Sequence, residues 1–139
     1  MKRFVLDASV ALAWFLDQPV APIASKARQA LIDGSRALVP ALWVSEIANG
    51  FAVAERRALI TEPEANQSLT ALDQLLAQAI DITTDIIPVP RLLALSRRFR
   101  LSAYDAAYLE TAQRERLALA TLDQSLRAAA TRAGIELFR

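Results

Sequence analysis

The sequence of 139 residues contains no histidine and no cysteine. Without cysteine, the chain can form neither a disulfide bond nor a thiolate metal site. Without histidine, cleavage of RNA by a pair of histidines acting as acid and base is excluded. Any chemistry in this chain must therefore use carboxylates, hydroxyls, amides and arginine.

Long hydrophobic runs are also missing. The longest apolar stretches, Ala8–Leu16 and Ala37–Val44, are too short to cross a bilayer. The N-terminus is basic and then apolar, but Asp7 interrupts it too early for a secretory signal. We therefore expect no membrane association and a cytoplasmic location, and we interpret residues 2–6 as an ordinary strand.

Neither sign of charge is in excess. The 16 basic and 15 acidic residues give a net charge of +1, so bulk electrostatics do not indicate a nucleic-acid-binding protein. Lysine is scarce, since only Lys2 and Lys26 occur. Arginine suits bidentate contacts to phosphate, although genomic base composition explains the arginine bias more simply.

The hydrophobic pattern indicates strands that alternate with helices. The hydrophobic fraction of 54% is ample for a core, and the length fits a single domain over residues 1–139. Strands are expected at residues 2–6, 37–39, 80–87, 117–120 and 135–138. Helices are expected at residues 10–16, from Pro22 to Asp33, at 42–57, from the Thr61–Glu64 capping box to Ala79, from Pro90 to Phe99, and at 103–115 and 122–133.

This alternation implies an α/β fold, namely a three-layer α/β/α sandwich with a mostly parallel central sheet. The two helices on either side of the Thr61–Glu64 capping box are long and are joined by a short turn. They therefore predict a protruding, antiparallel helix pair.

Four carboxylates stand where strands end or helices begin. Asp7 and Asp123 follow the first and fourth strands, while Glu46 and Asp105 lie near the first turns of their helices. In open parallel sheets, sites form beyond the carboxyl ends of the strands. If the first and fourth strands are neighbours, all four acids face one cleft.

Each acid, taken alone, fits a helix cap better than a ligand. Asp105 stands three residues after Ser102, as in a capping box, and Asp123 can cap the last helix. Four acids at one end of a sheet repel one another and are costly to desolvate, and a divalent cation removes that penalty. Their oxygen atoms select Mg²⁺ or Mn²⁺ over zinc, so the pattern predicts metal-assisted cleavage of a phosphodiester, with Glu46 handling the attacking water.

The segments around these four acids resemble the sequence motifs of PIN-domain nucleases, specifically the VapC-type toxins of bacterial toxin–antitoxin pairs. The four segments, in order along the chain, are Phe4–Val10, Val39–Asn49, Leu101–Tyr108 and Leu119–Asp123. Any one of them is a weak signal, but all four in this order span essentially the whole chain.

The resemblance implies a Mg²⁺- or Mn²⁺-dependent endoribonuclease that inhibits translation until a cognate VapB-type antitoxin blocks it. It assigns catalytic roles to Asp7, Glu46, Asp105 and Asp123, with Asp7, Asp105 and Asp123 as metal ligands. It also implies that Ser9, Asn49 and Thr121 support these acids or orient water. A homodimer is implied too, with the C-terminal segment of the antitoxin lying across the active-site groove, and transfer RNA and ribosomal RNA are both open as targets.

Other readings of the same residues compete with this one. A receiver domain needs an acid pair after its first strand and a lysine late in the chain, but here only Asp7 follows the first strand and no lysine occurs after Lys26. A haloacid-dehalogenase-type phosphatase needs a second aspartate two residues after the first, and this chain has Ser9 there. A non-catalytic PIN-like module that binds RNA or serves as a scaffold is the non-enzyme alternative.

Two further groups of residues have a functional and a structural interpretation. Arg97, Arg98 and Arg100 can grip RNA phosphates, but arginines near the C-terminus of a helix are also favoured by its dipole. Trp14 and Trp43 can stack on bases, although their apolar neighbours favour core or dimer packing. The structural interpretation is the simpler one in both cases.

Overall fold

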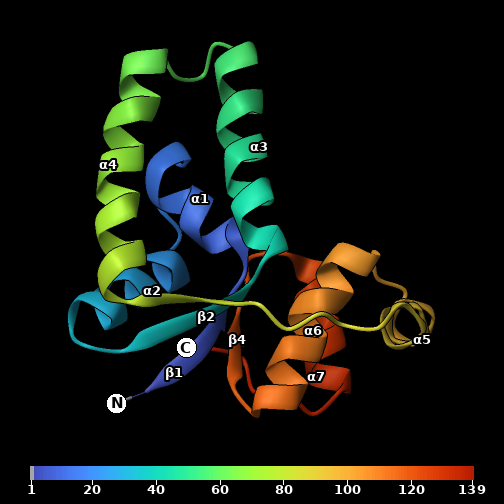
Figure 1. Ribbon diagram of the computed structural model, residues 1–139. Helices are drawn as coiled ribbons and strands as arrows, with labels where there is room; N and C mark the ends of the chain where they lie inside the picture. Colours follow the sequence, from blue (N-terminus) through green and yellow to red (C-terminus); the bar gives the residue numbers. More distant parts are fainter. Residues whose placement is uncertain (1) are drawn as a thin grey trace.

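The centre of the fold is a four-stranded sheet, seen in a computed structural model that describes residues 2–139 (Figure 1). The strands are β1 (Arg3–Leu6), β2 (Arg36–Pro40), β3 (Ile80–Thr83) and β4 (Ala118–Ala120). Their order is β3-β2-β1-β4, and every pair is parallel. The first and fourth strands are therefore neighbours, as the clustering of the acids required.

Helices on both sides of this sheet complete the predicted α/β/α sandwich (Figure 1). Helix α2 packs against β2 and β4, whereas α6 packs against β1 and β2 and in turn carries α5 and α7. The helices are α1 (Ala8–Leu16), α2 (Pro22–Ile32), α3 (Leu42–Arg56), α4 (Glu62–Gln78), α5 (Val89–Phe99), α6 (Ala103–Glu115) and α7 (Gln124–Arg132).

The core lies between the sheet and its helices. Val5, Leu6 and Leu119 of the two central strands are fully buried, as expected for strands of a parallel sheet that is covered on both faces. The indole of Trp43 is buried, and Trp14 donates its indole N–H to the carbonyl of Ala24 at 2.7 Å. Both tryptophans thus belong to the core, as their apolar neighbours predicted.

Helices α3 and α4 form the predicted antiparallel pair, which extends beyond the end of the sheet (Figure 1). The capping box at the start of α4 is present: the Thr61 hydroxyl accepts from the Glu64 backbone N–H at 3.3 Å, and Glu64 Oε1 accepts from the Thr61 N–H at 3.0 Å. Helices α2 and α7 end within one residue of the predicted ends at residues 33 and 133, and Gly34 and Gly134 just beyond them adopt positive φ angles of 103° and 74°.

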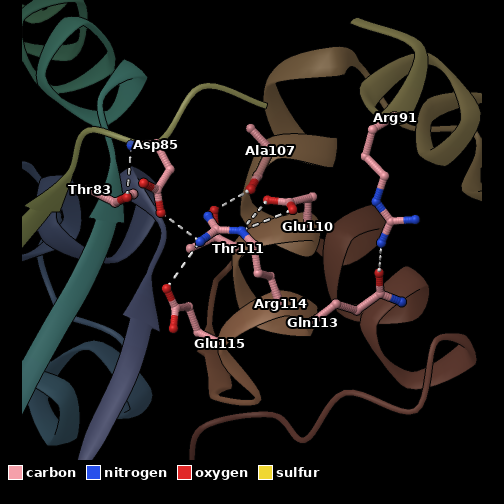
Figure 2. Close-up of polar contacts among 9 residues, drawn as sticks. All are labelled: Thr83, Asp85, Arg91, Ala107, Glu110, Thr111, Gln113, Arg114 and Glu115. Atoms are coloured by element: carbon pink, nitrogen blue, oxygen red, sulfur yellow. Dashed lines mark hydrogen bonds and ion pairs between the residues drawn. The ribbon is translucent and has the colours of Figure 1, made fainter. Parts of the chain in front are cut away.

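The prediction of a strand over residues 80–87 was too long, because β3 ends at Thr83. Thr83 pairs with Pro40, which is the last residue of β2, so the following residues find no strand to pair with. Instead the chain crosses toward α6, where Asp85 accepts from Arg114 Nη1 at 2.8 Å (Figure 2). Arg114 also contacts Glu110 and Glu115, so one guanidinium holds the crossing segment against α6.

The prediction of a final strand over residues 135–138 was also wrong. Only Leu137 forms a bridge, with Leu119 of β4. Strand β4 has just three residues, so only two backbone hydrogen bonds join it to this segment. The Leu119 N–H donates to the Glu136 carbonyl, and the Phe138 N–H donates to the Leu119 carbonyl, each at 2.9 Å. Within residues 2–139, no helix is both long enough and apolar enough to span a membrane.

Candidate active site

A pocket of about 310 Å³ opens beyond the carboxyl ends of β1 and β4. Asp7 directly follows β1 and Asp123 closely follows β4, and because these strands are neighbours both acids reach the pocket. Glu46 reaches it from α3 and Asp105 from the first turn of α6. The pocket is lined by Asp7, Ala8, Ser9, Leu12, Glu46, Asn49, Gly50, Asp105 and Asp123.

Asp7 is the most buried of the four acids, with 5% of its surface exposed. It occupies the residue before α1, but its side chain makes no capping hydrogen bond to that helix. Its Oδ2 atom instead accepts from the hydroxyls of Ser9 at 2.6 Å and Thr121 at 2.7 Å. Two side chains on different elements therefore fix the orientation of this carboxylate.

Burial raises the pKa of the Asp7 carboxyl, the two hydroxyls lower that pKa, and the nearby Asp123 charge raises it again. Because the sum of these effects is a raised pKa, ionised Asp7 is less stable here than in water. A cation in the pocket would restore the preference for the ionised form.

Helix α1 begins at Ala8 and not at residue 10 as predicted, so Ser9 lies inside its first turn. Its hydroxyl donates to Asp7 and accepts from the backbone N–H of Leu122 at 3.1 Å. Ser9 therefore ties α1 to the segment that follows β4, as well as supporting Asp7.

The carboxylate of Asp123 caps a helix, whereas that of Asp105 does not. Asp123 caps α7, since its Oδ1 atom accepts from the Leu126 N–H at 2.8 Å. For Asp105 only half of a capping box is present, because the Ser102 hydroxyl accepts from the Asp105 N–H at 3.1 Å. Within the described residues the Asp105 carboxylate does not complete the capping box by accepting from the Ser102 backbone N–H, and Asp105 lines the pocket.

The pKa of Asp105 is also raised, first by burial and then by the charges of Asp123 and Asp7. The same holds for Glu46: burial raises its pKa most, and Asp7 and Asp105 raise it further. The four acids thus lie near enough to repel one another across the pocket. Such mutual repulsion is typical of a site that binds a positive ligand.

Tyr108 is a site residue that the sequence interpretation missed. Its hydroxyl donates to Glu46 Oε1 at 2.5 Å, from a side chain that is fully buried. Burial and the neighbouring Glu46 carboxylate raise the pKa of Tyr108, so the phenol stays protonated and remains a donor. Its spacing of three residues after Asp105 places both on one side of α6, and this was the available signal.

Helix α1 approaches α3 closely beside the pocket, at Gly50. A Cβ atom at Gly50 would lie 2.5 Å from Leu12 Cδ2, which is closer than real contacts allow. Gly50 stands one helical turn after Glu46, so this contact packs the middle of α1, at Leu12, against the part of α3 that follows Glu46. Asn49, its neighbour, also lines the pocket.

The pocket has the donors that a hard divalent cation prefers, namely carboxylate, hydroxyl and amide oxygens. Burial, and after it the charges of neighbouring acids, raises the pKa values of Asp7, Glu46 and Asp105, so a bound cation would favour their ionised forms. Within residues 2–139 no three acids are close enough to form a ready-made metal cage. The residues therefore fit Mg²⁺ or Mn²⁺ in chemistry, and binding would draw the carboxylates closer together.

A comparison with models of protein families identifies the family to which this chain belongs. The PIN domain model matches residues 4–131. The chain belongs to the PIN domain family. No curated protein matches the sequence significantly.

Solved structures share the fold of this PIN domain. The crystal structure of PAE2754 from Pyrobaculum aerophilum aligns with a TM-score of 0.67 and 21% identity, covering 92% of this chain and 84% of that one. The crystal structure of FitAcB from Neisseria gonorrhoeae aligns with a TM-score of 0.63 and 20% identity, covering 98% and 96% of the two chains. At these identities the likeness concerns the fold.

Proposed function

We propose that this PIN domain is a Mg²⁺- or Mn²⁺-dependent endoribonuclease. The observation that carries the proposal is the meeting of Asp7, Glu46, Asp105 and Asp123 in one pocket. Membership of the PIN domain family, whose members are generally nucleases, supports it. The absence of histidine and cysteine from the sequence supports it as well, because an acid-lined pocket is then the chemistry that remains.

In this proposal Asp7, Asp105 and Asp123 hold the metal ion. The ion would supply a Lewis acid for the scissile phosphate and would lower the pKa of an attacking water. Asp7 is suited to the role because Ser9 and Thr121 hold one of its oxygens and leave the other for the ion. Asp123 contributes in the same way, since capping of α7 uses only its Oδ1 atom.

Glu46 positions the attacking water and accepts its proton. A general base works best when its pKa lies near the working pH, and burial moves the pKa of Glu46 upward in that direction. The Tyr108 hydroxyl fixes one oxygen of Glu46, so the other faces the water. Asn49 and Ser9 line the same pocket and provide further polar groups for orienting water.

The direct test is cleavage of total RNA by the purified protein. We expect cleavage with added Mg²⁺ or Mn²⁺, loss of cleavage with EDTA, and recovery when the metal is returned in excess. Sequencing the new RNA ends would identify the target, with transfer RNA and ribosomal RNA as the two candidates. Binding of RNA with no cleavage under any metal would instead favour the non-catalytic PIN-like module.

We further infer that the chain acts as the toxin of a toxin–antitoxin pair in the cytoplasm, as a homodimer that a VapB-type antitoxin blocks. The resemblance of residues 4–10, 39–49, 101–108 and 119–123 to VapC-type toxins supports this role. Exposed apolar side chains such as Ile86 and Val89, which are 92% and 76% exposed, support a protein contact surface.

Expression in bacteria tests the toxin role. We expect induction to arrest growth and protein synthesis, and co-expression of the neighbouring small gene to restore both. An Asp105→Asn variant, expressed at the same level, controls for the burden of expression. Normal growth with folded, nuclease-active wild-type protein would contradict the toxin role while leaving the nuclease proposal in place.

Replacing Tyr108 with phenylalanine tests the proposed role of Glu46. The change removes the hydroxyl that donates to Glu46 Oε1 and keeps the ring in the core. Because hydrogen bonds to charged groups contribute about 1.5–3 kcal/mol, we expect kcat to fall by roughly 10- to 100-fold with little change in KM. Single-turnover cleavage assays measure this effect.

The control for this variant is a double-mutant cycle with Glu46→Gln. If Tyr108 acts through Glu46, Tyr108→Phe costs little further activity once Glu46 has been replaced. An equal loss in both backgrounds would mean that the tyrosine affects cleavage by another route.

A further inference from the structure

A second and larger cavity lies at the opposite end of the sheet from the acidic pocket. It has a volume of about 710 Å³ and is built around the first residues of β1 and β4 and the last part of the chain. Asp7 and Asp123 lie beyond the other ends of these same strands, so the two cavities do not share a residue. Both ends of the chain lie on this side of the molecule (Figure 1).

This cavity, here called the basic groove, carries five cationic side chains against two acidic ones, Asp33 and Glu136. The five cations are Lys2, Arg3, Lys26, Arg116 and Arg139. The whole chain has a net charge of only +1, so positive charge is concentrated here while the acidic pocket carries the opposite sign. Both lysines of the sequence belong to the groove.

The cations of the basic groove are not balanced by ion pairs. Within residues 2–139 the salt bridges involve Arg36 and Arg114, and none of the five groove cations takes part. Like charges gathered around a concave surface repel one another, and they attract an anion. Arginine and lysine are the side chains that bind phosphate groups.

The floor of the groove is apolar and aromatic. Phe138 is half-buried, and its ring packs on that of Phe4 with centroids 4.5 Å apart. Phe138 and Leu117 both line the groove, so an apolar surface lies next to the cations. A flat base can stack on such a surface while a phosphate contacts the rim, and the volume lies within the range of small-ligand sites.

We propose that the basic groove binds a nucleotide, with its phosphate held by Lys26, Arg116 and their basic neighbours and its base on Phe138. The same chemistry is presented by a free mononucleotide and by the phosphorylated end of an RNA strand. The proposal does not depend on nuclease activity, because the groove is separate from the acidic pocket.

Calorimetric titration with adenosine 5′-monophosphate at low ionic strength tests this proposal. We expect binding to weaken about tenfold or more in Lys26→Gln/Arg116→Gln, because two charge-assisted contacts are lost. Both side chains are exposed, so the substitutions leave the core intact. The matched control is Arg56→Gln/Arg57→Gln at the tip of the helix pair, which removes the same charge and should leave binding unchanged.

Two further arms define the ligand. Inorganic phosphate should bind more weakly than the mononucleotide, because it lacks a base to stack on Phe138. The second probe is a 5′-phosphorylated, 2′-O-methyl RNA hexamer, which resists cleavage. If the groove binds an RNA end, the hexamer should bind more tightly than adenosine monophosphate. If the groove binds a free nucleotide, the hexamer should bind less tightly.

Several outcomes would overturn the proposal. These are no binding of any probe at millimolar concentration, unchanged affinity in Lys26→Gln/Arg116→Gln, or an equal loss in the Arg56→Gln/Arg57→Gln control. Equal affinity for inorganic phosphate and the mononucleotide would also overturn it, since the base would then play no part.

Discussion

Replacing Asp7 with asparagine is expected to lower the rate of RNA cleavage by about 100- to 1000-fold while the protein stays folded. Asp7 is the most buried acid of the pocket, and it lies at the end of a central strand. In the proposed mechanism it is the metal ligand with the most restricted orientation. An amide oxygen is a weaker ligand than a carboxylate and carries no charge to attract the cation.

Asparagine is preferred to alanine for this test because of the two hydroxyls that donate to Asp7. Its amide oxygen can still accept from Ser9 and Thr121, whereas alanine would leave both hydroxyls without their acceptor inside the protein. Thermal denaturation should therefore show a folded variant. Lost cleavage can then be assigned to the site and not to unfolding.

The matched control is Asp73→Asn. Asp73 is exposed on α4, so this variant makes the same chemical change away from the acidic pocket. Cleavage by the control should equal that of the wild type in the same assay. If folded Asp7→Asn cleaves RNA as fast as this control, the assignment of the acidic pocket as the active site is wrong.

The sequence was most informative where structure is local. The Thr61–Glu64 capping box, the glycine stops and the start of α6 after Ser102 each depend on a few neighbouring residues, and the structure has all of them. The meeting of the acids also followed from a simple rule, because carboxyl ends of parallel strands lie at one edge. That rule needed β1 and β4 to be neighbours, and they are.

The errors arose where distant parts of the chain decide the outcome. Residues 84–87 include Thr84, Ile86 and Ile87, whose types favour strands, yet β2 ends at Pro40, so they have nothing to pair with. The short length of β4 likewise reduced the expected last strand to a single bridge. The bond between Tyr108 and Glu46 joins residues 62 positions apart, so the spacing of Tyr108 from Asp105 could place both on one side of α6 but could not identify Glu46 as the partner.

The roles of the seven predicted site residues remain a prediction, although their positions are informative. Six of them line the acidic pocket, and Thr121 supports it by donating to Asp7. Asp123 both caps α7 and lines the pocket, so a cap and a ligand are not exclusive alternatives for an aspartate. From the sequence, cap and ligand were treated as competing interpretations of each acid, and for Asp123 that opposition was wrong.

Removal of metal should make the acidic pocket a source of instability, and Asp105→Asn should reveal this. Burial and the charges of Asp123 and Asp7 raise the folded-state pKa of Asp105 above its unfolded value of about 3.9. The folded protein then binds more protons than the unfolded chain, so stability falls as pH rises through the raised pKa. In EDTA at neutral pH, Asp105→Asn is expected to melt at a higher temperature than the wild type.

The difference in melting temperature between Asp105→Asn and the wild type depends on pH and on bound metal. Below about pH 3 the carboxyl is largely protonated in both states, so the two melting temperatures should converge. Added Mn²⁺ should raise the melting temperature of the wild type more than that of Asp105→Asn, because binding to the folded state stabilises it. Melting curves from pH 3 to pH 8, with EDTA or with Mn²⁺, measure both effects.

Asp81→Asn is the matched control, and its melting temperature is expected to change in the opposite direction. The bidentate pair with Arg36 lowers the pKa of Asp81, so this carboxyl stabilises the fold above its unfolded pKa and loses that contribution as pH falls. Asp81→Asn should therefore melt below the wild type at neutral pH, with or without metal. If both variants shift in the same direction in EDTA, repulsion within the acidic pocket is not what Asp105→Asn relieves. If Mn²⁺ raises the melting temperature of wild type and Asp105→Asn equally, Asp105 is not a metal ligand.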